Sequence, residues 1–287
     1  MGQFLKDKSA VVTGSGSGGI GKAVAVALAA EGASVVVNDI GRDPEGNFLA
    51  DKVVQEISAD GGIAVANHDS VATVEGGKNI IDTAVKNFGK VDILVNCAGN
   101  FKRSPAIEVA EDTWKSIVDV HLNGHFNCCR PAMLEMVKQK SGRIINFSSR
   151  AAAGGGGNMA YSAAKAGILG LTAALAGDLK EYGITSNCII PSADTKLFPG
   201  LRPKFATETM PATLSLDPAY IAVVVAYLAT DYAKNITGQF FYSSGGDILI
   251  YPKLLQLPTA APMFIRKIGK WTIEELQQVL PPLLGVE

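Results

Sequence analysis

A regular alternation of short β-branched runs with helix-length segments constrains this chain more than any other feature. The strand-like runs are Ala10–Thr13, Ser34–Asn38, Ile63–Asn67, Val91–Asn96, Arg143–Phe147, Thr185–Ile190 and Gly238–Tyr242. Parallel strands need long crossover connections, which are usually helices, so the alternation predicts a parallel sheet with helices on both faces. We therefore expect an α/β fold, a doubly wound parallel sheet of about seven strands.

The alternation covers residues 1–251, which we expect to form one domain, with residues 252–287 as a C-terminal extension. Within the domain, residues 192–216 contain Pro199, Pro203 and Pro211 and show no clear period. Such a segment predicts a mobile loop, either a substrate loop or a disordered insertion. In the extension we expect a short helix at about residues 273–280, with a capping box at its start and the Pro281–Pro282 pair at its end.

Charge and apolar runs exclude several classes of protein. The 26 basic residues balance 27 acidic ones without a block of like charge, so nucleic acid is not an expected partner. The longest apolar runs, Ala23–Ala30 and Ile221–Ala229, fall short of the ~18 residues that a membrane span needs. The four Cys and three His show no metal-ligand spacing, so no metal is expected. The chain has no apolar leader and no terminal Ser-Lys-Leu, and we expect a cytoplasmic protein.

A glycine-rich segment, Thr13–Gly21 (TGSGSGGIG), follows the first expected strand and leads directly into a helical pattern. Glycines let a backbone turn tightly and approach a pyrophosphate, and the N-terminus of the following helix supplies amide donors. The segment matches G-x-G-x-x-G in two registers, so individual phosphate contacts stay open. Its position predicts a dinucleotide-binding turn.

An acidic residue, Asp39, follows the second expected strand in VVVND. A carboxylate there can accept hydrogen bonds from both ribose hydroxyls of NAD and would repel the 2′-phosphate of NADP. Arg42 follows three residues later, and its guanidinium could pair with that phosphate instead. We expect NAD, and Arg42 leaves NADP open.

The motif Tyr161-Ser162-Ala163-Ala164-Lys165 places a phenol and an ammonium four residues apart, on one face of an expected helix. A nearby cation favours the phenolate and should lower the pKa of Tyr161 from its reference value of ~10. Such a tyrosine can exchange a proton with an alcohol or a carbonyl. The motif therefore predicts general acid/base chemistry.

Together these motifs resemble those of the short-chain dehydrogenase/reductase family over roughly residues 5–250. The matching features are TGSGSGGIG, Asp39, Asp69, NCAG at Asn96–Gly99, Ser148–Ser149 and YSAAK. The resemblance implies a Rossmann-like subunit in which Tyr161 is the acid/base, Lys165 holds the nicotinamide ribose and a serine binds the substrate oxygen. The cofactor-binding residues that we expect are Gly14, Ser17, Gly19, Ile20, Gly21, Asp39, Asp69, Ser70, Asn96, Ala98, Gly99, Tyr161 and Lys165.

Two adjacent serines compete for the substrate-binding role. Aligning the strand GRIINFSS with the family pattern selects Ser149, twelve residues before Tyr161, whereas the usual family spacing selects Ser148. Successive strand residues face opposite ways, so we expect only one to face the site. We expect Ser149, with Tyr161 and Lys165, to form the catalytic set.

Three further positions depart from the family pattern. The glycine loop is one residue longer than usual, and Ser192 stands where the family usually has Gly. His121 occupies the helix position that usually carries a catalytic Asn. We do not expect Asn123 to replace that Asn, because two residues along an α-helix turn a side chain by ~200°. His121 could support a water relay toward Lys165 or only fill space, and both interpretations stay open.

In detail the chain is most similar to the dehydrogenase part of peroxisomal multifunctional enzymes of β-oxidation. The similarity rests on the extended loop after VVVND, on NHDSV at Asn67–Val71, on His121 and on a C-terminal Trp-Thr-x-Glu-Glu segment. It implies an NAD-dependent alcohol dehydrogenase/ketone reductase for a bulky secondary alcohol, above all a 3-hydroxyacyl-CoA-type thioester. Lys196, Arg202 and Lys204 could meet CoA phosphates or be ordinary surface charges.

Two other functions stay open from the sequence. One is a hydroxysteroid or cyclic-alcohol dehydrogenase, and the other is a catalytically degenerate NAD-binding scaffold or partner subunit. The family resemblance also implies a homo-oligomer, either a tetramer or a dimer.

Overall fold

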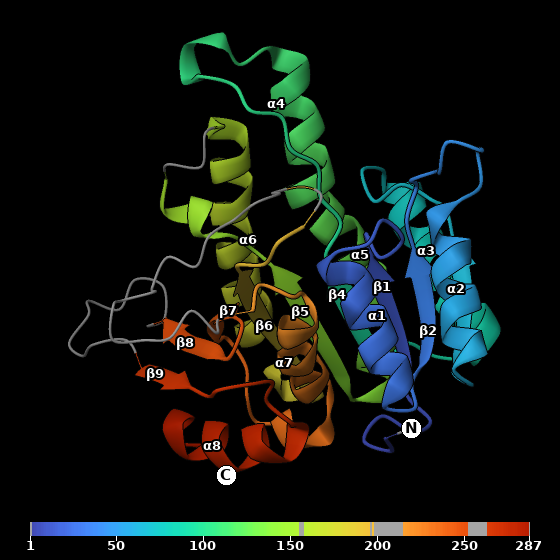
Figure 1. Cartoon of the computed structure of the whole chain (residues 1–287), viewed down its shortest axis with the longest axis vertical. Coiled ribbons are helices and arrows are strands. Elements are labelled where there is room, and N and C mark those ends of the chain that lie inside the picture. The colour runs from blue at the N-terminus through green and yellow to red at the C-terminus, as the bar shows by residue number, and fades with distance from the viewer. Residues whose placement is uncertain (1, 155–157, 196, 198–214, 252–262, 287) are drawn as a thin grey trace.

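The computed structural model describes residues 2–154, 158–195, 197, 215–251 and 263–286. Its centre is a nine-stranded sheet in the order β3-β2-β1-β4-β5-β6-β7-β8-β9 (Figure 1). The strands are β1 (Ser9–Thr13), β2 (Ser34–Asn38), β3 (Ile63–Asn67), β4 (Ile93–Asn96), β5 (Gly142–Phe147), β6 (Ile184–Pro191), β7 (Phe240–Ser244), β8 (Asp247–Tyr251) and β9 (Met263–Arg266). β1 to β7 pair in parallel, which confirms the doubly wound parallel sheet.

The expected number of about seven strands is two too low. β8 and β9 are antiparallel strands at the sheet edge beyond β7. An antiparallel hairpin needs only a tight turn, here at Gly245–Gly246, so no helix-length segment marks the next strand. The sequence periodicity used for the parallel strands could not reveal it.

Helices cover both faces of the sheet (Figure 1). They are α1 (Ile20–Ala30), α2 (Leu49–Ala59), α3 (Val74–Phe88), α4 (Glu111–Val118), α5 (Gly124–Gln139), α6 (Met159–Asp178), α7 (Ala219–Ala229) and α8 (Ile273–Leu284). Alternate residues of β1 face the helix layers on opposite sides of the sheet. Ala10 and Val12 belong to a hydrophobic cluster that includes residues of α1, α2, α7 and α8. Val11 faces the other cluster, with α3, α5 and α6.

The C-terminal segment packs on the same hydrophobic core as α1 and α7. β9 completes the sheet, where Arg266 donates to both carboxylate oxygens of Asp247 at 2.5 and 2.7 Å. Helix α8 packs on α7 and begins with the expected capping box between Thr272 and Glu275. The expectation that Pro281 and Pro282 end this helix is wrong, because it continues to Leu284. A proline φ is itself close to helical, and the buried Leu276 and Leu280 hold α8 against the core.

Most of the expected loop 192–216, including Lys196, Arg202 and Lys204, lies outside the described residues.

Among the described helices, α6 alone is long and apolar enough to cross a membrane, judged by length and composition only. It also packs against β5 and β6 and carries Tyr161 and Lys165, as a core helix does.

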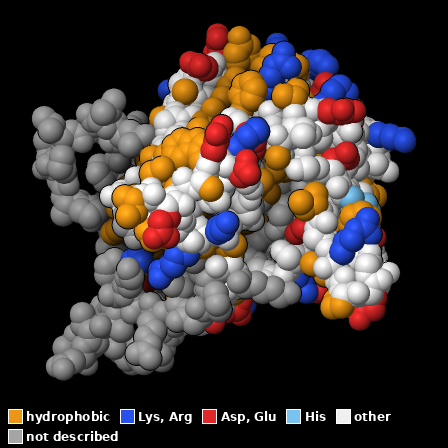
Figure 2. Space-filling model, turned by 90° about the horizontal axis from the view of Figure 1, so that it is seen from above, with side chains coloured by type: hydrophobic (Ala, Val, Ile, Leu, Met, Phe, Trp, Pro, Cys, Tyr) orange, Lys and Arg blue, Asp and Glu red, His pale blue; other side chains and the backbone are white. Residues whose placement is uncertain are grey.

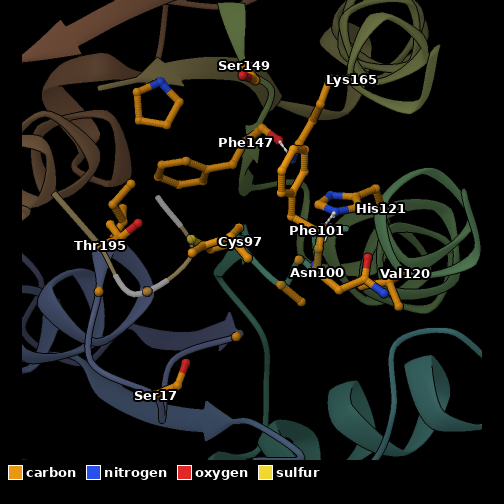
Figure 3. A pocket seen from close by; sticks show the side chains of 18 of the residues that line it. Ser17, Cys97, Asn100, Phe101, Val120, His121, Phe147, Ser149, Lys165 and Thr195 are labelled. Atoms are coloured by element: carbon orange, nitrogen blue, oxygen red, sulfur yellow. Dashed lines mark hydrogen bonds between the residues drawn. The ribbon is translucent and has the colours of Figure 1, made fainter. Parts of the chain in front are cut away.

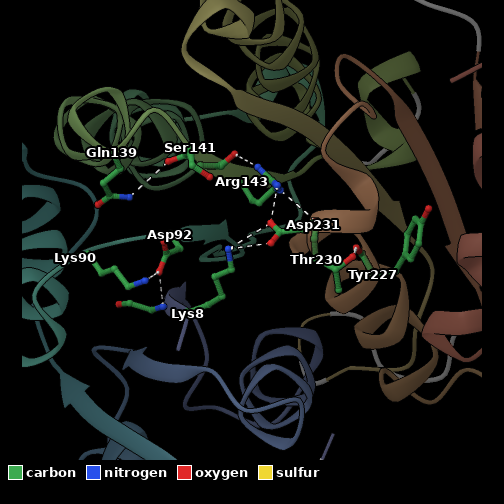
Figure 4. A network of polar contacts seen from close by, with 11 residues as sticks. Lys8, Lys90, Asp92, Gln139, Ser141, Arg143, Tyr227, Thr230 and Asp231 are labelled. Carbon is green, nitrogen blue, oxygen red and sulfur yellow. Dashed lines mark hydrogen bonds and ion pairs between the residues drawn. The ribbon is translucent and has the colours of Figure 1, made fainter. Parts of the chain in front are cut away.

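A polar network joins the amino ends of β1, β4 and β5 (Figure 4). Asp92 accepts from the amide of Ser9 at 2.8 Å, which links the segment before β4 to β1. Arg143 is 5% exposed and donates to the Thr230 carbonyl at 3.2 Å, the Gly142 carbonyl at 2.9 Å and Asp231 at 3.0 Å. The guanidinium therefore satisfies backbone carbonyls inside the protein while its acidic partner lies at the surface.

We expect Arg143→Met to lower the free energy of unfolding by about 1–3 kcal/mol, because buried carbonyls lose their donor. Asp231→Ala should cost less than about 1 kcal/mol, because the Asp231 side chain is 67% exposed. Urea denaturation of both variants measures the difference. Equal losses would show that the ion pair, rather than the bonds to the carbonyls, stabilises this end of the sheet.

Candidate active site

A cavity of about 930 Å³ lies at the carboxyl ends of the parallel strands (Figure 3). Ligands bind at this edge in open α/β sheets, where the strand order reverses between β1 and β4. The structure brings together nearly every expected site residue at the cavity, namely Gly14, Ser17, Gly19, Ile20, Gly21, Asp39, Asp69, Ser70, Ala98, Gly99, Ser149, Tyr161 and Lys165.

Asn96 is the expected site residue that does not line the cavity. It is 1% exposed and donates to Asn146 Oδ1 at 3.0 Å, with Cys129 Sγ at 3.3 Å. Asn146 in turn donates to Thr172 on α6 at 3.0 Å. Strand alternation thus turns Asn96 into the interior, where it links β4 to β5, and its expected role in cofactor binding stays a prediction.

The glycine loop fits a pyrophosphate on the geometry of its backbone. Gly14 has φ +65°, and a Cβ there would lie 2.5 Å from the Ala98 Cα, so only glycine fits. Thr13 Oγ1 accepts from the amides of Cys97 and Ala98, both at 3.1 Å, which holds the β4 loop beside the turn. The N-cap of α1 is Gly19, which has no side chain to bond the first amides of the helix, and free amides at a helix start suit an anion.

The Asp39 carboxylate supports the glycine loop from the end of β2. Its Oδ2 accepts from the Gly16 amide and its Oδ1 from the Gly41 amide, both at 2.8 Å. Asp39 also lines the cavity, as expected for a group that meets a ribose. It therefore links the glycine-rich turn to the cavity wall.

Asp69 borders the same end of the cavity, and the side-chain amides of two asparagines hold its carboxylate. Its two carboxylate oxygens accept from Asn67 at 2.9 Å and from Asn79 at 3.2 Å. Asn38 at the end of β2 donates to Asn67 Oδ1 at 2.9 Å. This network fixes the ends of β2 and β3 against α3.

Tyr161 lies in the first turn of α6, where Asn158 caps the helix. Asn158 Oδ1 accepts from the Tyr161 amide at 3.0 Å, and Asn158 Nδ2 donates to the Lys102 carbonyl at 2.7 Å. The cap thus fixes both the tyrosine backbone and the loop after β4. Asn158 was not among the expected site residues, although an Asn three residues before the Tyr161 motif is a typical N-cap signal.

Burial raises the pKa of the Tyr161 phenol, and a hydrogen bond with the Ser149 side chain opposes that rise. The expected lowering of this pKa by Lys165 is therefore wrong for this structure. The Lys165 ammonium donates to the Phe147 carbonyl at 2.7 Å (Figure 3). It lies 5.6 Å from the centre of the Tyr161 ring. Burial also lowers the pKa of Lys165 to about 8.

The two serines face different partners. Ser149 hydrogen-bonds the Tyr161 phenol and accepts from the Ala151 amide at 3.2 Å. Ser148 is 2% exposed and donates to the Lys165 carbonyl at 2.7 Å. This geometry favours Ser149 as the partner of Tyr161, whereas the Ser148 hydroxyl is held by the backbone of α6.

His121 lies in a π-helical turn, Asp119–Asn123, between α4 and α5. Its ring meets the Tyr161 ring edge-on at 5.1 Å, and its Nε2 lies 2.7 Å from the Asn100 carbonyl. A Cβ on Gly99 would lie 2.6 Å from His121, so the imidazole fills the space that this glycine leaves. Burial lowers the pKa of His121 well below its usual value, which keeps the ring neutral at neutral pH.

Asn123 was not expected to replace the family Asn, and this stays a prediction. It is exposed and donates to Asp119 Oδ1 at 2.8 Å. Arg103, Arg150 and Phe101 line the cavity but carry no sequence signal, since they meet the site only through the fold. No cluster of three or more His, Cys, Asp or Glu that could hold a metal occurs among the residues that the structure describes.

Comparison with known proteins assigns the chain to a family. Residues 8–203 match the family profile described as short chain dehydrogenase. The chain belongs to the short-chain dehydrogenase family. Membership shows an oxidoreductase scaffold, and the glycine loop and Asp39 fit the nicotinamide cofactor that the family typically binds.

The relatives span several kinds of short-chain dehydrogenase. A peroxisomal hydratase-dehydrogenase-epimerase of Saccharomyces cerevisiae is 41% identical over 84% of this chain and 26% of its own length. A 3-oxoacyl-[acyl-carrier-protein] reductase of Synechocystis is 39% identical over 85% of this chain and 98% of its own. A short chain dehydrogenase structure from Mycobacterium avium aligns with a TM-score of 0.78 at 37% identity, over 98% and 96% of the two chains. The chain thus spans about a quarter of the length of this peroxisomal relative and of its counterpart from Neurospora crassa.

Proposed function

We propose that this protein is an NAD(H)-dependent oxidoreductase that interconverts a bulky secondary alcohol and its ketone, with a 3-hydroxyacyl-CoA-type thioester as substrate. The observation that carries the proposal is the hydrogen-bonded pair of Tyr161 and Ser149, with buried Lys165 beside it, in the cavity that the glycine loop also lines.

The chain's own residues would orient the substrate and move its proton. The bound nicotinamide would give or accept the hydride at the carbinol carbon. The phenol of Tyr161 would exchange the proton of the substrate oxygen, while the hydroxyl of Ser149 hydrogen-bonds that oxygen. Because burial raises the pKa of Tyr161, the phenol is protonated at neutral pH, which suits proton donation to a ketone.

The choice of NAD rests on the charges at the β2 end of the cavity. Asp39 lines it there, and a carboxylate at that position disfavours a 2′-phosphate. Among the described residues, the cationic side chains that line the cavity are Arg103, Arg150 and Lys165, which follow β4 and β5 or lie on α6. Arg42 does not line it and donates to the Gly46 carbonyl at 2.6 Å.

Two observations support an acyl thioester. The Synechocystis relative is named for reducing a 3-oxoacyl group on an acyl carrier protein, and the yeast relative's name includes a dehydrogenase. Arg103 and Arg150 line the cavity and could meet the phosphates of a CoA carrier. The cytoplasmic location and the homo-oligomer stay predictions from the sequence.

A substrate panel tests the proposal. Formation of the reduced nicotinamide would be followed by its absorbance with 3-hydroxyacyl-CoAs, hydroxysteroids and cyclic alcohols, each with NAD and with NADP. We expect saturable turnover of the thioesters with NAD. Turnover of a steroid or cyclic alcohol alone would contradict the substrate, and binding of NADH without any turnover would favour the scaffold alternative.

A further inference from the structure

Three side chains stack beside the β2 end of the cavity. The Arg42 guanidinium carbon lies 3.4 Å from the centre of the Phe48 ring. The His68 ring lies 3.7 Å from the same centre and is nearly parallel to it, at 8°. Two groups this close to one ring centre cannot share a face, so Arg42 and His68 cover opposite faces of Phe48.

The surrounding contacts hold this stack in place. Arg42 and Phe48 form an antiparallel bridge, and the Leu49 amide donates to the Gly41 carbonyl at 2.9 Å. On its far side, His68 Nε2 lies 3.0 Å from Asp51 Oδ1. The small hairpin of residues 42–48 is therefore closed at its base, and its Phe48 ring contacts the segment after β3 through His68.

The tip of the hairpin is closed as well. Asp43 accepts from the Asn47 amide at 2.8 Å and pairs with Lys52 on α2 at 2.6 Å. Together with the bond from Arg42 to the Gly46 carbonyl, these contacts leave the guanidinium little freedom to turn toward the cavity. The loop that carries Arg42 is thus ordered by its own residues.

Arg42 is also the cation nearest in sequence to Asp39. Asp39 reaches the Gly41 amide, one residue before Arg42. A guanidinium released from the ring could turn back along this loop and pair with a phosphate on the ribose that Asp39 faces. On the face shown in Figure 2, acidic and basic side chains are intermixed, with no large area of one charge.

We propose that Phe48 determines the specificity for NAD over NADP. Its ring holds the Arg42 guanidinium by stacking and so keeps a phosphate-binding cation away from the adenosine ribose. The inference rests on the proposed use of NAD and explains how a chain with an arginine three residues after Asp39 avoids NADP. Phe48 acts through Arg42 and is not a residue of the cavity lining.

The test measures the affinities of the full-length protein for NADH and for NADPH by fluorescence titration. Phe48→Ala and Phe48→Leu should each raise the affinity for NADPH relative to NADH about tenfold, the effect of one added charge-assisted hydrogen bond. Phe48→Leu keeps apolar bulk at the start of α2 in case the alanine variant folds poorly. Phe48→Tyr keeps the ring and should leave the ratio unchanged.

Removal of the arginine decides whether the gain passes through it. Arg42→Ala alone should leave the ratio as it is, and Arg42→Ala with Phe48→Ala should cancel the gain. The proposal is overturned if the ratio does not move in Phe48→Ala and Phe48→Leu, if the gain survives in the double variant, or if Arg42→Ala alone weakens NADPH binding.

Failure of the proposed function gives a different result. A wild-type protein that binds NADPH as tightly as NADH would contradict the NAD assignment. The role of Phe48 would still stand if its removal raised NADPH affinity in an Arg42-dependent way.

Discussion

Tyr161→Phe should lower turnover about 10²–10⁴-fold while NADH binds with unchanged affinity. The substitution removes only the hydroxyl that exchanges a proton with the substrate and hydrogen-bonds Ser149. The ring itself, which packs edge-on against Phe101 and His121, stays in place. Steady-state kinetics with the substrate found in the panel, together with an NADH titration, measure the two quantities separately.

Tyr242→Phe is the matched control for this variant. Tyr242 is also buried, in β7, but does not line the cavity, so loss of its hydroxyl should leave turnover near the wild-type value. An equal loss in both variants would mean that the hydroxyls matter for folding. Unchanged turnover in Tyr161→Phe would refute the acid/base assignment.

Ser149→Ala should lower kcat about 10²-fold, because the site loses a hydroxyl donor at the substrate oxygen. The same change also frees the Tyr161 phenol from its hydrogen-bond partner. The KM for NAD should stay close to the wild-type value, since Ser149 is not expected to bind the cofactor. Steady-state kinetics with varied substrate and varied NAD give both constants.

The neighbouring serine offers a control with the same chemistry. Ser148→Ala removes the donor to the buried Lys165 carbonyl, so we expect it to reduce the free energy of unfolding by about 1–3 kcal/mol. Its effect on kcat should be much smaller than that of Ser149→Ala. If Ser148→Ala caused the larger loss of kcat, the roles of the two serines would have to be exchanged.

Several features of this protein follow from residues that are close in sequence. The β-branched runs and the helical segments between them predict the parallel sheet, because strand and helix periods are properties of the local backbone. The glycines of Thr13–Gly21 indicate a tight turn in the same way, and Gly14 does adopt a positive φ. Tyr161 and Lys165 share a helix face because they are four residues apart.

Other features depend on partners that are distant in sequence, and only the tertiary structure decided them. Ser149 rather than Ser148 meets Tyr161, and Asn96 turns inward to Asn146. Arg42 stacks on Phe48 instead of turning toward Asp39.

The same distinction explains the remaining errors. The antiparallel strands β8 and β9 add to a sheet edge that only the folded β7 provides, and α8 passes two prolines because the core on α7 holds it. The pKa of Tyr161 rises because burial of the phenol outweighs the opposing hydrogen bond with Ser149. The spacing of residues in the sequence determines which side chains can share one face of a helix or strand. What each side chain does there depends on its burial and on its hydrogen-bond partners, which come from distant parts of the chain.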